Sequence, residues 1–182
     1  MHQEGSSLIL NAEPNAAHKG LVFLEKYYNL KSVITQNIDF LHTRAGSTNV
    51  LELHGSGEFG KCLVCYKEYH HKAIAELIKE KGIPPRCTAC KGLIKPNVIL
   101  FGEILPDDVF SKARNEILKA DLIIVIGSSL SVAPAAYLPR LALLNRSKLV
   151  IINEEKTHYA TAATILIQEK AGLVFSRIVK IL

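Results

Sequence analysis

Aliphatic runs of four to six residues recur along the chain, separated by stretches with helical periodicity. Because the runs lack the alternation of a sheet with one solvent face, they predict buried strands at 32–35, 49–53, 97–101, 122–127, 148–153 and 163–168. Helices are predicted at 14–29, 107–120, about 134–145, and from about 172 onwards. This order predicts an α/β fold with a doubly wound, mostly parallel Rossmann-like sheet.

Polar residues follow several of the predicted strands at their carboxyl ends. Gln36 and Asn37 come after the first strand, His54 after the second, and Asn153 after the strand at 148–153. In a parallel sheet these ends lie along one edge, where ligands bind in a crevice. We therefore expect a ligand site at this edge.

The four cysteines form two CxxC pairs, Cys62–Cys65 and Cys87–Cys90, with 21 residues between them. Paired spacing of this kind is typical of a structural zinc site with four thiolate ligands, which leaves no open position for water. Disulfides are disfavoured in an intracellular chain, and a redox CxxC would not need a matched second pair. We predict a small zinc-ribbon module at 55–96 beside a Rossmann-like NAD-binding domain made of 1–54 and 97–182.

The composition excludes some classes of function. With 182 residues, 48% hydrophobic content and no apolar run long enough to cross a bilayer, the chain is expected to be soluble and cytoplasmic, without a membrane partner. The net charge of +5 falls to +3 if four thiolates hold one Zn²⁺, and the basic residues are scattered. Direct binding of nucleic acid is therefore not expected.

Six motifs, in their order along the chain, resemble the sirtuin family of NAD-dependent protein lysine deacylases. They are TQNIDFLHTRAG (35–46), LELHGS (51–56), the two CxxC pairs, VILFGE (98–103), GSSLSV (127–132) and IINEE (151–155). The resemblance extends from about Asn11 to the C-terminus. It implies that an acyl group passes from a lysine of a protein or peptide to the ribose of NAD, yielding nicotinamide and O-acyl-ADP-ribose.

The resemblance also implies roles around the nicotinamide end of NAD. His54 would be the base towards the ribose hydroxyls, and Asn37 would orient the ribose and a water molecule. Gln36 would bind ribose hydroxyls, Asp39 would accept from the nicotinamide carboxamide, and Ile38 would pack beside that ring. Without the resemblance, Asn37 and Asp39 would be interpreted as a helix cap and His54 as a strand-end histidine.

Two further groups of residues follow from the resemblance. The adenosine side of NAD would be bound by Gly127, Ser128, Ser129, Asn153, Glu155 and Ala171. The acyl-lysine peptide would contact Val98, Phe101, Gly102, Glu103, Ser131 and Val132, where it would add a strand. The alternative for 97–101 is an ordinary buried strand.

Two family motifs do not occur in this sequence: the glycine-rich Gly-Ala-Gly-x-Ser loop with the strand before it, and Pro-x-Phe-Arg. From this we expect an N-terminally truncated sirtuin whose catalysis is impaired, because backbone donors to the pyrophosphate would be lost. The alternative function is a catalytically inactive, zinc-stapled scaffold that binds a peptide or protein.

Overall fold

The computed structural model describes residues 12–100 and 102–181, which fall into two compact units. We call the first the cysteine unit; it contains Gln36–Phe40 and His54–Leu105. We call the second the parallel-sheet unit; it contains Glu13–Thr35, Leu41–Leu53 and the chain from Pro106 onwards. The domain boundaries expected from the sequence remain a prediction, and each unit is described by itself.

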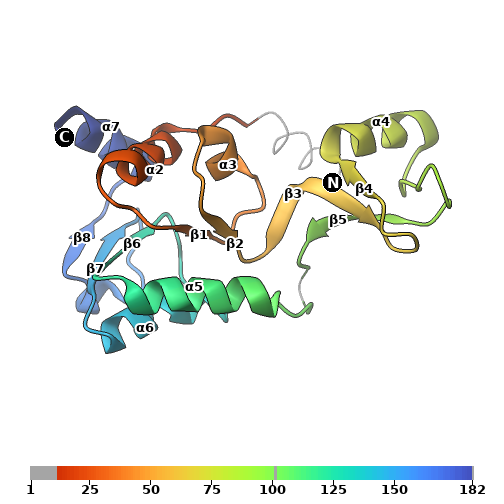
Figure 1. The fold of residues 1–182 in the computed structure, drawn as a ribbon. Helices are drawn as coiled ribbons and strands as arrows, with labels where there is room; N and C mark the ends of the chain where they lie inside the picture. Colours follow the sequence, from red (N-terminus) through yellow and green to blue (C-terminus); the bar gives the residue numbers. More distant parts are fainter. Residues whose placement is uncertain (1–11, 101, 182) are drawn as a thin grey trace. The chain divides into compact units, whose positions relative to one another are not determined.

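The parallel-sheet unit contains two sheets with only parallel pairing (Figure 1). Strand β1 (Val33–Thr35) pairs with β2 (Val50–Glu52), and β7 (Lys148–Ile152) lies between β6 (Leu122–Ile126) and β8 (Ile165–Ile167). The pairing aligns the carboxyl ends, with Thr35 opposite Glu52 and Ile126 opposite Ile152. The predicted Rossmann-like α/β class is confirmed.

Helices cover both faces of these strands (Figure 1). Helices α2 (Ala16–Tyr27) and α7 (Ala171–Ile181) bury one core cluster, made of Ala17, Leu21, Val33, Ile152, Val174 and Phe175. Helices α5 (Asp107–Lys119) and α6 (Leu138–Leu144) bury another with Leu53, Ala113, Ile117, Ala135, Leu138 and Ala142. Val33 packs in the first cluster and Ile34 against the second, which is why strand β1 is apolar on both faces.

Three short helical segments complete the parallel-sheet unit. These are α3 (Leu41–Ala45) and the 3₁₀ turns η1 (Ala135–Tyr137) and η2 (Ala160–Ala162). Among the helices of the described residues, none combines the length and the apolar character needed to cross a membrane.

Gly20 lies where α2 crosses α7, and a methyl group there would overlap the ring of Phe175, which is 1% exposed. We expect Gly20→Ala to destabilise the fold by about 1–3 kcal/mol, the usual effect of overpacking. This outweighs the gain of about 0.5–1 kcal/mol that alanine brings to a helix interior. The midpoint of urea unfolding measures the difference.

Gly172→Ala is the matched control for this prediction, because no atom lies within 4 Å of a methyl group added in α7 at that position. It should be neutral or slightly stabilising. An unfolding midpoint for Gly20→Ala at or above that of Gly172→Ala would contradict the packing argument.

The cysteine unit is built around an antiparallel sheet with the order β4-β3-β5. Strand β3 (Gly55–Cys62) pairs with β4 (Glu68–His70) and with β5 (Ile94–Val98), and helix α4 (His71–Lys81) follows β4. The prediction of a parallel strand at 97–101 is wrong, because β5 ends at Val98 and runs antiparallel to β3. The aliphatic run at 97–101 thus extends past the end of its strand.

Candidate functional site

The segment Gln36–Phe40 of the cysteine unit directly follows β1, and His54 comes two residues after the end of β2. Because β1 and β2 are parallel, Gln36 and His54 leave the same sheet edge, and the His54 ring reaches the Gln36 backbone. Asn37 is exposed, whereas Gln36, Ile38 and Asp39 are half-buried. The polar residues predicted after the first two strands therefore follow the carboxyl ends of β1 and β2, at the same edge of that sheet.

The His54 ring has a fixed tautomer. Its Nδ1 lies 3.0 Å from the carbonyl oxygen of Gln36. A carbonyl oxygen only accepts hydrogen bonds, so Nδ1 carries the proton and donates. Nε2 then keeps its lone pair and is the nitrogen that can accept a proton from a ligand.

The backbone on either side of His54 is held in tight contacts. The Ile99 amide donates to the carbonyl oxygen of His54 at 2.9 Å. Gly55 has φ +71°, and a methyl group there would overlap the carbonyl oxygen of Asn97. The positive φ and the close approach of Asn97 require glycine at 55. Strand pairing brings Val98, the partner of Gly55, next to His54. This places one of the predicted peptide-binding residues beside the predicted base.

Glu103 closes the turn that follows β5. Its carboxylate accepts from the Lys95 ammonium at 2.8 Å and from the Leu100 amide at 3.0 Å. These hydrogen bonds, that from Lys95 above all, hold the pKa of Glu103 below its ordinary value. Gly102 has a left-handed φ of +89°, and Phe101 lies outside the described residues. The Glu103 side chain is thus used within the chain, and the Glu103 amide donates to the Leu100 carbonyl oxygen at 2.9 Å.

The four cysteines come together in one cluster. Their sulfur atoms lie within 4.8 Å of one another, with 3.4 Å between Cys62 and Cys90 and 3.6 Å between Cys65 and Cys87. Four thiolates around one zinc ion at about 2.3 Å would lie about 3.8 Å apart, so the cluster fits a tetrahedral zinc site. Cys62 and Cys87 are fully buried, as expected of structural ligands.

The surroundings of the four thiols shift the pKa values of Cys65 and Cys87 in opposite directions. The Tyr69 hydroxyl, which donates to Cys87 Sγ at 3.1 Å, lowers the pKa of Cys87 to about 5. The Lys67 amide lowers the pKa of Cys65, but the neighbouring thiols of Cys90 and Cys87 outweigh it and raise that pKa to about 12. Four crowded sulfurs cannot all ionise alone, and a divalent cation among them removes that obstacle.

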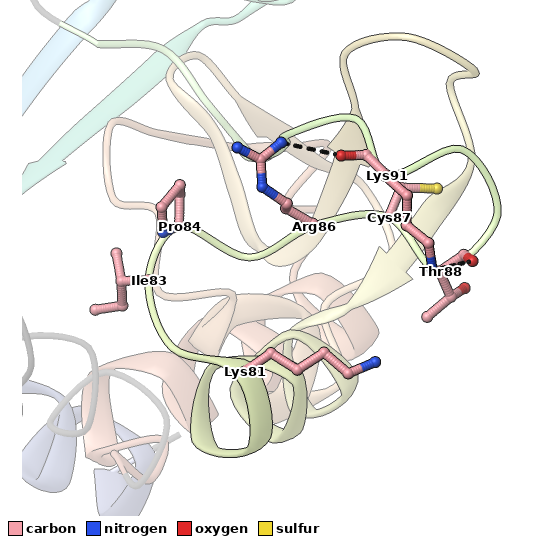
Figure 2. A pocket seen from close by; sticks show the side chains of 7 residues that line it. All are labelled: Lys81, Ile83, Pro84, Arg86, Cys87, Thr88 and Lys91. Carbon is pink, nitrogen blue, oxygen red and sulfur yellow. Dashed lines mark hydrogen bonds between the residues drawn. The ribbon is translucent and has the colours of Figure 1, made fainter.

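A hollow of about 240 Å³ lies beside the cysteine cluster (Figure 2). It is lined by Lys81, Ile83, Pro84, Arg86, Cys87, Thr88 and Lys91. Arg86 Nη1 donates to the Lys91 carbonyl oxygen at 3.1 Å, and Lys91 Nζ donates to that of Thr88 at 3.4 Å (Figure 2). These bonds brace the turn that carries Cys87 and Cys90.

The parallel-sheet unit has a larger hollow at the carboxyl ends of β6 and β7, with a volume of about 530 Å³. It is lined by Asn15, Gly127, Asn153, Glu154, Glu169, Lys170, Ala171, Gly172 and Leu173. The size falls in the range of roughly 300–1,000 Å³ that is typical of small-molecule sites. Gly127 has φ +56°, and a methyl group added there would meet nothing within 4 Å, so the backbone is open to a ligand.

Three of the predicted adenosine-side residues meet in this hollow: Gly127, Asn153 and Ala171. The other three do not line it. Ser128 Oγ accepts a hydrogen bond from the Leu130 amide at 3.3 Å. The hydroxyl groups of Ser129 and Ser131 are hydrogen-bonded to each other at 2.7 Å. The carbonyl oxygen of Glu155 accepts from Asn153 Nδ2 at 2.8 Å. Ser131 and Val132 are exposed.

Sequence reasoning missed Asn15 and Glu169, which line the hollow. Asn15 caps α2, with Oδ1 accepting from the Ala17 amide at 2.9 Å, and Glu169 Oε1 accepts from the Lys170 amide at 2.8 Å ahead of α7. The signal for Asn15 was its place before a predicted helix, which indicates a cap but not a ligand. Glu169 carries no local signal.

Comparisons with known proteins agree with this geometry. The model of the Sir2 family matches residues 2–134. An NAD-dependent protein deacetylase of Thermodesulfovibrio yellowstonii is 42% identical over 182 residues, all of this chain and 71% of the relative. The NAD-dependent protein deacetylase of Thermotoga maritima is 43% identical over 163 residues, 90% of this chain and 66% of the relative.

Solved structures are similar as well. A Sir2 complex with a p53 peptide and NAD⁺ has a TM-score of 0.90 at 40% identity, covering 94% of this chain and 71% of that one. A sirtuin structure from work on substrate affinity has a TM-score of 0.94 at 40% identity, covering 98% and 72%.

Proposed function

This chain belongs to the Sir2 family, and on that premise we propose that it removes acyl groups from lysine side chains of proteins with NAD as co-substrate. It is an NAD-dependent protein lysine deacylase, and its products are nicotinamide, the free lysine and O-acyl-ADP-ribose. Bound NAD supplies the ribose to which the acyl group passes. The single observation that carries this function is the orientation of His54, whose Nδ1 donates to the Gln36 carbonyl.

His54 is the general base in this proposal. Because its Nδ1 is engaged, Nε2 is the nitrogen that takes the proton of a ribose hydroxyl. An imidazole suits this transfer, since its pKa lies closest to neutral among the side chains. The hydrogen bond at Nδ1 also keeps the ring from rotating, which preserves the direction of the Nε2 lone pair.

The segment Gln36–Asp39 binds the nicotinamide end of NAD in this proposal. The carboxamide of Asn37, which is exposed, orients the ribose and a water molecule, and Gln36 binds the ribose hydroxyls. Asp39 accepts from the nicotinamide carboxamide, and Ile38 packs against the ring. These roles need short side chains with both donors and acceptors, which is what this segment offers.

The adenosine end is assigned to the hollow of the parallel-sheet unit. Gly127 permits close approach of the ligand to the backbone, Asn153 binds the ribose, and Ala171 contacts adenine through its backbone. Ser128, Ser129 and Glu155 complete the assigned residues. The position of the hollow beyond the carboxyl ends of parallel strands supports this assignment.

The protein or peptide substrate is proposed to bind as an added strand. Val98 and Phe101 form walls for the acyl-lysine side chain. Gly102 and Glu103 are assigned backbone contacts to the peptide; at Glu103 this means the carbonyl oxygen, because the carboxylate binds Lys95 and the amide donates to Leu100. Ser131 and Val132 are assigned the same backbone role, and both are exposed.

Zinc is assigned a structural role, because four sulfur ligands leave no position for a reacting group. When bound, it neutralises the thiolates of Cys62, Cys65, Cys87 and Cys90 and ties the two turns that carry them. Thiolates of this kind persist in a reducing compartment, which supports a cytoplasmic location.

Incubating the purified chain with NAD and an acetyl-lysine peptide tests the function. Mass spectrometry should detect deacetylated peptide, nicotinamide and O-acetyl-ADP-ribose in equal amounts, and no product should form without NAD. Binding of NAD and peptide without turnover would refute the deacylase function and support the scaffold alternative.

A further inference from the structure

His71, the first residue of α4, packs between β3 and the segment Gln36–Phe40 of the cysteine unit. Its ring stacks on Phe40 with 5.1 Å between centroids and 30° between planes. Its Nδ1 lies 3.3 Å from the carbonyl oxygen of Glu58, so this nitrogen carries the proton and donates. The ring therefore links Phe40 to strand β3.

Phe40 is held in a backbone conformation that a side chain disfavours. Its φ is +49°, in the left-handed region, and its side chain is only 5% exposed. Such residues persist where the surrounding structure over-determines them. Stacking on His71 is a contact of this kind, because moving the ring of Phe40 out of place would expose it to water.

The segment is thus fixed at both ends and in the middle. At its start, His54 donates to the Gln36 carbonyl at 3.0 Å, and in the middle the Gly57 amide donates to the Ile38 carbonyl at 2.8 Å. His71 acts at its end. The proposed function uses the first imidazole and leaves the second without a role.

We propose that His71, in its neutral form, is a positioning residue that holds the segment Gln36–Phe40 in place for the nicotinamide end of NAD. Protonation of this imidazole would then loosen the segment and lower activity in acid. The expected effect on activity rests on the proposed function. The positioning itself rests on the contacts of His71 with Phe40 and Glu58.

The groups around His71 disfavour a positive charge on it. Burial has the largest effect and lowers its pKa from the ordinary value of 6.5; the neighbouring His70, with 4.1 Å between ring centroids, and Lys72 lower it further. The amino end of α4 adds the positive end of the helix dipole. Glu58 on β3 raises the pKa of His71. In the segment Gln36–Phe40 the charged residue is Asp39.

The sign of the pH effect follows from this direction. A lowered pKa means that the folded state favours the neutral ring, so the stabilising contact is fully present above about pH 6.5 and is lost as the pH falls through the folded value. A protonated ring can keep its Nδ1 donor, but its free energy is lower when it is hydrated, so protonation favours its movement into water. That movement separates it from Phe40.

Hydrogen exchange of the Gly57 amide tests the proposal, because this amide is protected by the Ile38 carbonyl of the segment. In the wild type its protection factor should fall by about tenfold or more between about pH 8 and about pH 5, the window in which histidine titrates. In His71→Asn, which keeps an amide donor for Glu58 but cannot be protonated, protection should not change with pH. His71→Ala should reduce protection throughout.

The Leu63 amide, which donates to the Leu93 carbonyl at 2.9 Å in the same unit, is the reference for general unfolding. A parallel fall in protection at Leu63 and Gly57 would overturn the proposal, because the whole unit would then be opening. The same pH dependence in the wild type and in His71→Asn would overturn it as well.

Activity gives a second readout. The proposal adds one group, His71, that must be neutral, so the limiting slope of log kcat/KM in acid should be smaller by about 1 in His71→Asn than in the wild type. The same limiting slope in both proteins would contradict the proposal. The exchange experiment needs neither NAD nor turnover, so a wild type without deacylase activity would refute the proposed function while exchange still decides the role of His71.

Discussion

Replacing His54 with alanine should lower kcat/KM for NAD-dependent deacylation by about 10²–10⁴-fold, the usual contribution of a general base. The variant loses the lone pair at Nε2 and also the hydrogen bond from Nδ1 to the Gln36 carbonyl. Steady-state rates of nicotinamide release and peptide deacetylation measure the loss.

His54→Asn separates the two losses. An asparagine side chain can place an amide donor where Nδ1 lies and so keep the Gln36 carbonyl satisfied, but it has no basic nitrogen. We expect it to bind NAD with an affinity close to that of the wild type, measured by calorimetry, and to be as slow as the alanine variant. An asparagine variant within tenfold of wild-type kcat would show that anchoring, and not proton transfer, is what His54 supplies.

His158→Ala is the matched histidine control for both variants. This residue belongs to the parallel-sheet unit, is exposed, and lies against Tyr159 with 4.3 Å between ring centroids. Its replacement should leave kcat/KM within about twofold, as expected for a surface substitution. A loss in this variant comparable to that in His54→Ala would remove the argument for a specific base.

Cys87→Ser should abolish zinc binding and unfold the cysteine unit. Structural zinc contributes about 10–16 kcal/mol of binding free energy in small zinc-binding peptides. That amount is comparable to or larger than the stability of a whole domain, about 5–15 kcal/mol. The core of this unit is small and includes two of the ligands, Cys62 and Cys87, beside Tyr69, Leu77 and Ile94.

Metal analysis should find one zinc ion per wild-type chain and none in the variant. Amide exchange should show protection lost throughout β3, β4 and β5. Ala89→Ser, an exposed position in the same turn, is the control and should keep both zinc and protection. A Cys87→Ser chain that retains exchange protection in β3 would contradict the role of metal in folding.

The parallel strands were predictable because burial on both faces leaves continuous aliphatic runs in the sequence. Strand β3 was not, since Gly55–Cys62 contains three glycines and only one large apolar residue, Phe59. Its strand conformation comes from pairing with β4, which follows after the short turn at 63–67, and with β5, which begins only at Ile94. The misplaced strand at 97–101 has the same origin, because the partner β3 determines where β5 begins and ends.

The chemistry was predictable to different degrees. The cysteine cluster follows from local spacing, because two residues between cysteines suffice to bring their sulfurs together. The residues of the adenosine-side hollow come from separate strands and helices, so Glu169 and Asn15 could be found only in three dimensions. His71 offered one signal, the adjacent pair His70–His71, which does not reveal contact with Phe40 about 30 residues earlier.

Over the described residues the chain passes between the two units five times, after Ala12, Thr35, Phe40, Leu53 and Leu105. One consequence concerns protein engineering. The metal-binding part cannot be transplanted as a single segment. A graft of 54–105 would leave behind Gln36–Phe40, the five-residue segment that His54 and His71 contact. A chimera that exchanges this part between relatives must carry both stretches from the same parent.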